Sequence, residues 1–315
     1  MNAKTPRQII IDTDPGQDDA IAILMALASP ELEVLGLTCV AGNVPLALTQ
    51  KNARMICELA GRTDIPVFAG AARPLVRTLV TAEYVHGKTG LNGPVLPAPV
   101  MALQDQDAVG FIVETIRSRP SGAVTLCPIG PLTNIALALI RAPEIAARIR
   151  EIVLMGGACF EGGNTTPCAE FNIFVDPQAA QKVFSSGIPL IVHPLDMTHQ
   201  ALTTSERVEK IRALNNPIAT AAAEMMDFFE RFDERKYGTD GGPLHDPNVI
   251  AWLLRPELYQ GRDVNVEIEV SSELTMGQTV VDWWGVTGRK INAHYIRNLD
   301  SDGFFELLTE RLARF

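Results

Sequence analysis

The fold of this chain is decided by residues 9–19, which read Ile9-Ile10-Ile11-Asp12-Thr13-Asp14-Pro15-Gly16-Gln17-Asp18-Asp19. The apolar triplet at the start predicts a buried strand, the Pro-Gly pair predicts a turn, and the apolar run 20–27 that follows predicts a helix. Four carboxylates therefore fall at the carboxyl end of a strand, where an open α/β sheet usually binds its ligand.

The spacing of these acids favours a cation site. Asp12 and Asp14 are two residues apart and point to the same side of an extended strand, while Asp18 and Asp19 lie at the positive end of the predicted helix. Crowded carboxylates repel one another unless a cation neutralises them, and oxygen ligands favour Ca²⁺ or Mg²⁺ over zinc. Capping the helix would need only one of these acids. For Asp12 a structural role and a functional role remain equally open.

The composition limits the possible partners. The chain has 315 residues, enough for a large core, and we expect residues 1–315 to form a single domain. Its formal net charge of -10, without a run of Lys or Arg, argues against nucleic acid as a partner. No stretch approaches the ~20 apolar residues of a membrane span, and no secretory signal core follows the N-terminus. The five scattered cysteines indicate neither disulfides nor zinc, so we expect a cytoplasmic protein with a small-molecule substrate.

Strand and helix patterns alternate through the first two-thirds of the chain. Strands are predicted at Arg7–Asp12, Glu33–Val40, Pro66–Ala69, Val124–Ile129, Glu151–Met155 and Leu190–Val192. Helices are predicted between them at Gln17–Ala28, Pro45–Ala60, Asp105–Arg119, Leu132–Arg141 and Pro177–Ser186. Such an order predicts an open, mainly parallel, doubly wound α/β sheet with helices on both faces.

The pattern changes after Met197. Further helices are predicted at Ser205–Leu214, Pro217–Arg235, Pro247–Leu254 and Asp302–Arg314. Strands are predicted at Val264–Val270, Thr279–Trp283 and Lys290–Ile296. We expect this late part to be a helical and antiparallel addition to the sheet. The long, Gly/Pro-rich segment 73–100 is typical of a functional lid.

Polar residues follow other predicted strands as well. Asn43 follows the second strand and would lie at the same sheet edge as Asp14, although a helix cap explains it equally well. Asn164, Glu170 and Asn172 lie near glycines that permit close approach of a ligand, and together they could bind several sugar hydroxyls.

A last pair, His245-Asp246, precedes a late apolar helix. Asp246 either caps that helix or completes the cation site begun by Asp14 and Asp19, with His245 nearby. The carbonyl groups of the strand end at 127–131 are further candidate ligands, or belong to a simple turn.

In combination these motifs resemble the nucleoside hydrolase family of the inosine–uridine-preferring type. The resemblance runs through nearly the whole chain and rests on the segments 12–20, 41–43, 86–91, 132–134, 154–157, 169–172, 176–177, 196–199 and 245–247. It implies the fold of that family and the hydrolysis of the N-glycosidic bond of a ribonucleoside to ribose and free base, with one tightly held Ca²⁺ as cofactor.

The resemblance also implies residue roles. The ion would be held by Asp14, Asp19, the carbonyl of Ile129 and Asp246, and Asp14 would be the general base that activates water. The transition state would be oxocarbenium-like, so nearby carboxylates would stabilise its positive charge. The residues implied to bind the substrate are Asp18, Asn43, Met155, Asn164, Glu170 and Asn172.

The resemblance defines the contacts to the nucleobase less closely than the contacts to the ion and the sugar. His86 would lie near the base or the 5′ side, and His245 is the candidate general acid for the leaving base. Arg235 and Tyr237 either approach the base or form a solvated helix end. Purine-specific relatives stack the base between tryptophans, and no matching pair stands in the pocket loops. We therefore expect a preference for uridine and cytidine, or a broad inosine–uridine preference.

The family resemblance suggests nucleoside salvage or catabolism and a homotetramer or homodimer. Three alternatives remain. A metal-dependent phosphohydrolase would also use an Asp-x-Asp motif, but its site needs basic groups, and only Lys88 lies in these loops. A non-catalytic nucleoside-binding protein is disfavoured by the intact acids. A hydrolase of another N-riboside, such as nicotinamide riboside, is an alternative that the sequence does not exclude.

Overall fold

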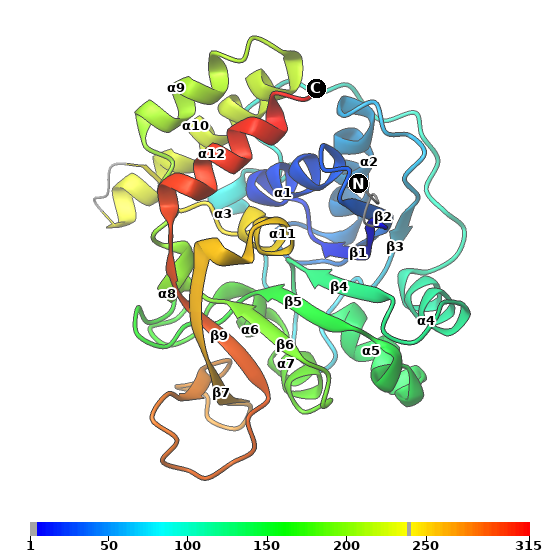
Figure 1. Ribbon diagram of the computed structural model, residues 1–315, viewed down its shortest axis with the longest axis vertical. Coiled ribbons are helices and arrows are strands. Elements are labelled where there is room, and N and C mark those ends of the chain that lie inside the picture. Colours follow the sequence, from blue (N-terminus) through cyan, green and yellow to red (C-terminus); the bar gives the residue numbers. More distant parts are fainter. Residues whose placement is uncertain (1–4, 238–240) are drawn as a thin grey trace.

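The computed structural model describes residues 5–237 and 241–315, with the side chains of 229–237 left out of the description. Within these residues nine strands form one sheet in the order β3-β2-β1-β4-β5-β6-β9-β7-β8 (Figure 1). The parallel strands are β1 (Arg7–Thr13), β2 (Leu32–Cys39), β3 (Val67–Ala69), β4 (Val124–Pro128), β5 (Glu151–Met155), β6 (Leu190–His193) and β9 (Ala293–Leu299). The antiparallel strands are β7 (Tyr259–Ile268) and β8 (Thr279–Asp282).

The predicted mainly parallel sheet is confirmed, but the last strands differ in detail from the prediction. Strand β9 pairs parallel with β6, with Leu190 opposite Ala293, and antiparallel with β7. The late addition is therefore antiparallel only at β7 and β8. Strand pairing between segments so far apart in the sequence leaves no local pattern from which it could be predicted.

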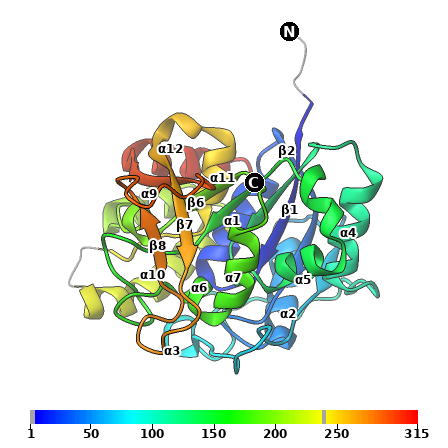
Figure 2. The same cartoon turned by 90° about the horizontal axis from the view of Figure 1, so that it is seen from below.

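Helices cover both faces of the sheet (Figures 1 and 2). One face carries α1 (Gln17–Leu27), α2 (Leu46–Leu59), α9 (Ser205–Arg212), α10 (Pro217–Tyr237), α11 (Pro247–Leu254) and α12 (Ser301–Leu312). The other face carries α4 (Ala108–Ser118), α5 (Thr133–Arg141) and α7 (Pro177–Phe184). This arrangement is the doubly wound layering that the sequence predicted.

Strand β1 connects the two cores. Ile9 and Ile11 pack in the core beneath α1, whereas Ile10 packs in the core on the opposite face, as the two-residue period of a strand requires. All eleven residues of α1 are buried, because α2, α10, α11 and α12 contact it. The polar first turn of α1 is therefore enclosed within the protein.

Several one-turn helices were not predicted. They are α3 (Glu83–His86), α6 (Phe171–Val175) and α8 (Leu195–Thr198), together with the 3-10 helices at Pro143–Arg148 and Pro256–Leu258. A single turn is too short to show a helical period in the sequence. Among the described residues no helix is both long and apolar enough to cross a membrane.

The carboxyl ends of the parallel strands meet at one edge. Asp14 follows β1, Asn43 follows β2, Ile129 follows β4, and Met155 ends β5. The backbone carbonyl of Asp12 accepts a hydrogen bond from the N–H of Ile129 at 2.8 Å, which keeps the ends of β1 and β4 level. This edge is where a ligand site is expected in an open α/β sheet.

Candidate active site

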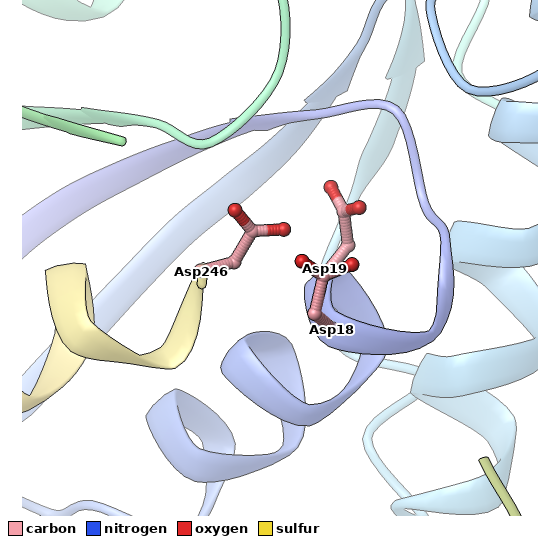
Figure 3. Close-up of side chains that lie close together, drawn as sticks. All are labelled: Asp18, Asp19 and Asp246. Carbon is pink, nitrogen blue, oxygen red and sulfur yellow. The ribbon is translucent and has the colours of Figure 1, made fainter. Parts of the chain in front are cut away.

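Three buried carboxylates converge where α1 begins. One oxygen from each of Asp18, Asp19 and Asp246 lies within 4.8 Å of the others. Asp18 and Asp19 stand on the first turn of α1, and Asp246 reaches toward them from the start of α11 (Figure 3). The positive end of α1 favours the negative charge of this group.

A fourth acid, Asp14, lies beside this group. Its Oδ2 accepts a hydrogen bond from the backbone N–H of Asn43 at 2.7 Å, while within the described residues its buried Oδ1 has no hydrogen-bond partner. The backbone at Gly42 and Gly130 contacts this carboxylate closely. A Cβ built on Gly42 would lie 2.0 Å from Oδ2, and a Cβ built on Gly130 would lie 2.3 Å from Oδ1. A side chain at either position would displace the Asp14 carboxylate, so glycine allows the backbone to approach it closely.

Asp19 is held by a set of donors. Its Oδ1 accepts from the Thr13 hydroxyl at 2.6 Å and from the backbone N–H of Asp14 at 3.2 Å. Its Oδ2 accepts from the backbone N–H of Gly16 at 2.9 Å and from Asn43 Nδ2 at 3.2 Å. These bonds fix the carboxylate at the turn between β1 and α1.

The electrostatics of this cluster call for a cation. Burial raises the pKa of Asp14, Asp19 and Asp246, and neighbouring carboxylates raise the pKa of Asp14 and of Asp246 further. Asp19 and Asp246 lie close together in this group, so their negative charges are unfavourable without a compensating charge. A hard divalent cation fits here, since it would neutralise these charges and give the free Oδ1 of Asp14 a partner.

The carbonyl of Ile129, the remaining candidate ligand, faces Asn172. Asn172 Nδ2 donates to this carbonyl at 2.9 Å and to the carbonyl of Met155 at 3.3 Å. The structure therefore brings Asn172 and Met155 to the ends of β4 and β5, next to a predicted ligand. Asp18, predicted to bind substrate, lies within the compact acid group.

Glu170 and Asn164 organise the loop after β5. Glu170 caps α6, accepting backbone N–H bonds from Asn172, Ile173 and Gly157 at 2.9–3.2 Å. Burial raises the pKa of Glu170 to about 7, against the opposing effect of these bonds. Asn164 Oδ1 accepts from the N–H of Phe171 at 2.9 Å.

His86 is packed against the start of α1. Its Nδ1 lies 2.7 Å from Oε1 of Gln17, and Gln17 Nε2 donates to the backbone carbonyls of His86 and Asn92 at 3.0 Å each. Burial lowers the pKa of His86 to about 4, so the ring is neutral at physiological pH. The 73–100 segment is thereby tied to the acid cluster through Gln17.

His245 stands next to the acid Asp246. Its Nδ1 lies 2.7 Å from the Thr198 hydroxyl, and its ring centroid is 5.9 Å from that of His199. His199 is partly exposed and faces Glu161, with 3.6 Å between Nδ1 and Oε2. The predicted contacts Arg235 and Tyr237 lie outside the residues whose side chains are described.

Comparison with known proteins identifies this arrangement. The model of the inosine–uridine preferring nucleoside hydrolase family matches residues 9–306. The chain belongs to this family. It is therefore an enzyme that hydrolyses N-glycosidic bonds of ribonucleosides, as the sequence motifs predicted.

Individual relatives can be aligned with almost the whole length of this hydrolase. An uncharacterised protein of Schizosaccharomyces pombe is 55% identical, over 98% of this chain and 99% of its own. The pyrimidine-specific ribonucleoside hydrolase RihA of Shewanella sp. strain MR-7 is 52% identical, over 98% of this chain and 96% of its own. A solved purine-preferring ribonucleoside hydrolase from Gardnerella vaginalis has a TM-score of 0.91 and 32% identity, with 98% of each chain covered.

In this nucleoside hydrolase Asp12 makes hydrogen bonds to neighbouring protein side chains. Its Oδ1 accepts from the Thr38 hydroxyl at 2.6 Å and from Asn134 Nδ2 at 2.8 Å, and burial raises its pKa to about 7. Asn134 Oδ1 in turn accepts from the N–H of Ala71 at 2.8 Å. These contacts favour the structural role that the sequence left open for Asp12.

Two further acids of the hydrolase were not predicted as site-forming residues. Asp196 accepts backbone N–H bonds from 159, 160 and 161 at 2.5–2.9 Å and a bond from the Tyr295 hydroxyl at 2.7 Å. Asp176 accepts from the N–H of Leu75 and from the Thr133 hydroxyl, both at 2.8 Å. Both acids anchor loops around the site, and both lie in motifs that carry the family resemblance, which was the available signal.

Proposed function

We propose that the chain is a Ca²⁺-dependent hydrolase of pyrimidine ribonucleosides. The observation that carries this proposal is the set of four buried carboxylates at the sheet edge, with Asp14 Oδ1 lacking a partner among the described residues. An all-oxygen, buried and strongly acidic site suits a hard divalent cation, and the flexible, many-ligand coordination of Ca²⁺ suits it better than zinc.

The ligands proposed for the ion are Asp14, Asp19, Asp246 and the carbonyl of Ile129. Asp18 lies close enough to Asp19 and Asp246 to join this set or to meet a ribose hydroxyl beside it. A bound divalent cation would supply positive charge that acidifies a water molecule. The rest of the chemistry falls to the side chains of this chain.

Asp14 is suited to accept the proton of the attacking water. Its Oδ2 is fixed by the backbone N–H of Asn43, whereas its Oδ1 is available. A carboxylate held in this way needs no reorganisation when the water approaches the sugar carbon. We assign Asp14 as the general base.

The ribose is proposed to lie between the acid cluster and the loop after β5. The residues proposed to contact the ribose are Asn43, Met155, Asn164, Glu170 and Asn172, which lie at or after the ends of β2 and β5. Hydroxyl contacts would orient the sugar, while the buried carboxylate of Glu170 would stabilise the positive charge that develops on the ring. Binding energy far from the breaking bond would thus lower the barrier.

On the base side we propose His245 as the group that donates a hydrogen to the leaving base, with His86 closing the pocket.

Two observations support a pyrimidine preference. The relative named as pyrimidine-specific is 52% identical, against 32% for the purine-preferring structure. Trp252 packs against His193 and Tyr259 instead of pairing with a second tryptophan.

The decisive experiment measures reducing-sugar release from uridine, cytidine, inosine, guanosine and nicotinamide riboside. The protein is used as purified, after chelation with EDTA, and after re-addition of Ca²⁺. We expect release from uridine and cytidine to exceed release from guanosine, to stop on chelation and to return with Ca²⁺. Faster release from guanosine would contradict the base preference, and release only from nicotinamide riboside would identify a different riboside as substrate.

The remaining expectations are proposals as well. We propose that residues 1–315 form one domain, because the sheet runs without interruption from β3 to β8. We also propose a homodimer or homotetramer and a cytoplasmic location, with a role in nucleoside salvage or catabolism. Multi-angle light scattering of the full chain tests the oligomeric state, and a monomer would contradict it.

A further inference from the structure

The hydroxyl group of Thr198 is bonded to the ring of His245. Thr198 ends α8, its side chain is fully buried, and its Oγ1 lies 2.7 Å from His245 Nδ1. The backbone N–H of Thr198 donates to the carbonyl of Pro194, and its carbonyl accepts from the N–H of Ala201, both at 3.0 Å. A residue with a fixed backbone therefore holds one nitrogen of the histidine ring.

The burial of this hydroxyl decides which ring nitrogen carries hydrogen. Within the described part of the chain, His245 is the sole hydrogen-bond partner of Thr198 Oγ1. If the neutral ring donated from Nδ1, the hydrogen of the buried hydroxyl would lack an acceptor, which is unfavourable. When Thr198 donates to Nδ1 instead, the hydroxyl hydrogen has an acceptor and the ring hydrogen lies on Nε2.

The same contact suits the protonated ring. Both ring nitrogens then carry hydrogen, and the hydroxyl of Thr198 can turn to accept from Nδ1. His245 thus presents a hydrogen on Nε2 in either charge state. The ring of His199 lies beside it, with the two centroids 5.9 Å apart, and Glu161 lies on the other side of His199.

We propose that Thr198 is a positioning residue, which presents the Nε2 hydrogen of His245 to the departing base. This inference rests on the proposed function, in which His245 lies beside that base. When the bond between C1′ and the base nitrogen breaks, its electron pair passes to the base, while water adds to C1′ and gives a proton to Asp14. The hydrogen on Nε2 stabilises the negative charge that forms on the base.

The test compares two substrates in the full-length, Ca²⁺-loaded enzyme. Uridine has a poor leaving group that needs a hydrogen donor, whereas nitrophenyl riboside has an activated leaving group that departs without one. The variant Thr198→Val keeps the shape of the side chain without its hydroxyl, and Thr198→Ser restores the hydroxyl. The matched control is Thr203→Val, since Thr203 is equally buried and its hydroxyl donates to the carbonyl of Gly242 at 2.8 Å.

We expect Thr198→Val to lower kcat for uridine by about tenfold, with KM and the rate on nitrophenyl riboside within about twofold. Thr198→Ser should recover most of the loss, and Thr203→Val should affect the two substrates alike. In the His245→Ala background the further change Thr198→Val should have no additional effect on uridine, because the two residues act through one contact. Equal losses on both substrates in Thr198→Val, without rescue by serine, would overturn the inference.

The same experiment separates this inference from the proposed function. Loss of both substrates alike in His245→Ala would show that His245 is not the donor, which overturns its assignment and the inference together. A selective loss in His245→Ala without a selective loss in Thr198→Val would overturn the inference alone. Thermal melting of each variant, compared with Thr203→Val, identifies any loss that comes from misfolding.

Discussion

The backbone N–H of Asn43 donates a hydrogen bond to Oδ2 of Asp14 over 2.7 Å, and this bond joins the ends of β2 and β1. It orients the Asp14 carboxylate so that Oδ1 is left for a ligand. Side-chain Nδ2 of Asn43 adds bonds of 3.2 Å to the carbonyl of Asp14 and to Asp19. The main chain of Asn43 therefore positions the proposed base, and its side chain positions a proposed cation ligand.

The variant Asn43→Ala separates these two contributions. It keeps the backbone bond to Asp14 but loses the amide that orients Asp19. We expect the affinity for Ca²⁺ to fall by about 10–100-fold, as for other changes that release a metal ligand. Isothermal titration calorimetry measures it, with Asn298→Ala on the exposed part of β9 as control. An affinity equal to that of wild type would show that the Asn43 side chain does not support the ion.

Replacing Asp14 should abolish turnover. Asp14→Ala and the isosteric Asp14→Asn both remove the proton acceptor, and we expect kcat to fall by at least about a thousandfold. Stopped assays of ribose release measure the residual rate, and Asp302→Asn, at an acid whose side chain is 88% exposed, serves as control. A rate within tenfold of wild type would refute the assignment of Asp14.

The ionisation of Glu170 should appear in the pH profile. Burial raises its pKa to about 7, so the carboxyl is largely protonated at pH 6 and ionised at pH 8. If the ionised form stabilises the sugar cation, kcat/KM should rise across this range. We expect Glu170→Gln to lower kcat/KM about a hundredfold at pH 8 and much less at pH 6. A parallel profile in both proteins would assign Glu170 to capping α6 only.

His193 predicts a pH dependence of stability. It is buried against Trp252 and Tyr259, neither ring nitrogen has a hydrogen-bond partner among the described residues, and burial lowers its pKa from 6.5 to about 3. Below pH 6.5 the unfolded chain takes up a proton that the folded ring does not, so the stability present above pH 6.5 is lost as the pH falls toward 3.

The aromatic variant His193→Phe cannot take up this proton. Its Tm should therefore fall less steeply than that of wild type between pH 6.5 and pH 4.5, with a difference of several degrees at the lower value. Differential scanning calorimetry across this range measures both curves. Curves that stay parallel would show that His193 does not contribute to acid sensitivity.

Much of the architecture could be predicted because its elements are long and amphipathic or fully apolar. The bounds of β5 and α11 agree residue for residue with the prediction, since apolar runs are followed there by Gly156 and by the Arg255-Pro256 pair. The helices α6 and α8 could not be predicted, because each is a single turn fixed by tertiary contacts. The parallel pairing of β9 with β6 also depends on long-range contacts alone.

The residues of the candidate site also divide into those that the sequence predicted and those that depend on long-range contacts. Asp14, Asp19 and Asn43 were predicted to share one sheet edge because parallel strands end there, and the structure joins them by hydrogen bonds. Asp18 was predicted as a sugar ligand, but only the fold shows how close it lies to Asp246. The contact between Thr198 and His245 has no sequence signal, because it joins two irregular segments across the chain.

The acid group of Figure 3 combines Asp18 and Asp19 on the first helix of the chain, α1, with Asp246 at the start of α11. A ribosome must therefore complete most of the polypeptide before Asp246 can reach Asp18 and Asp19. A nascent or truncated chain that lacks Asp246 would lack the full acid group, so the cation would bind late in the synthesis of the protein. Bound Ca²⁺ would then link α1 to α11, slowing unfolding more than it accelerates folding.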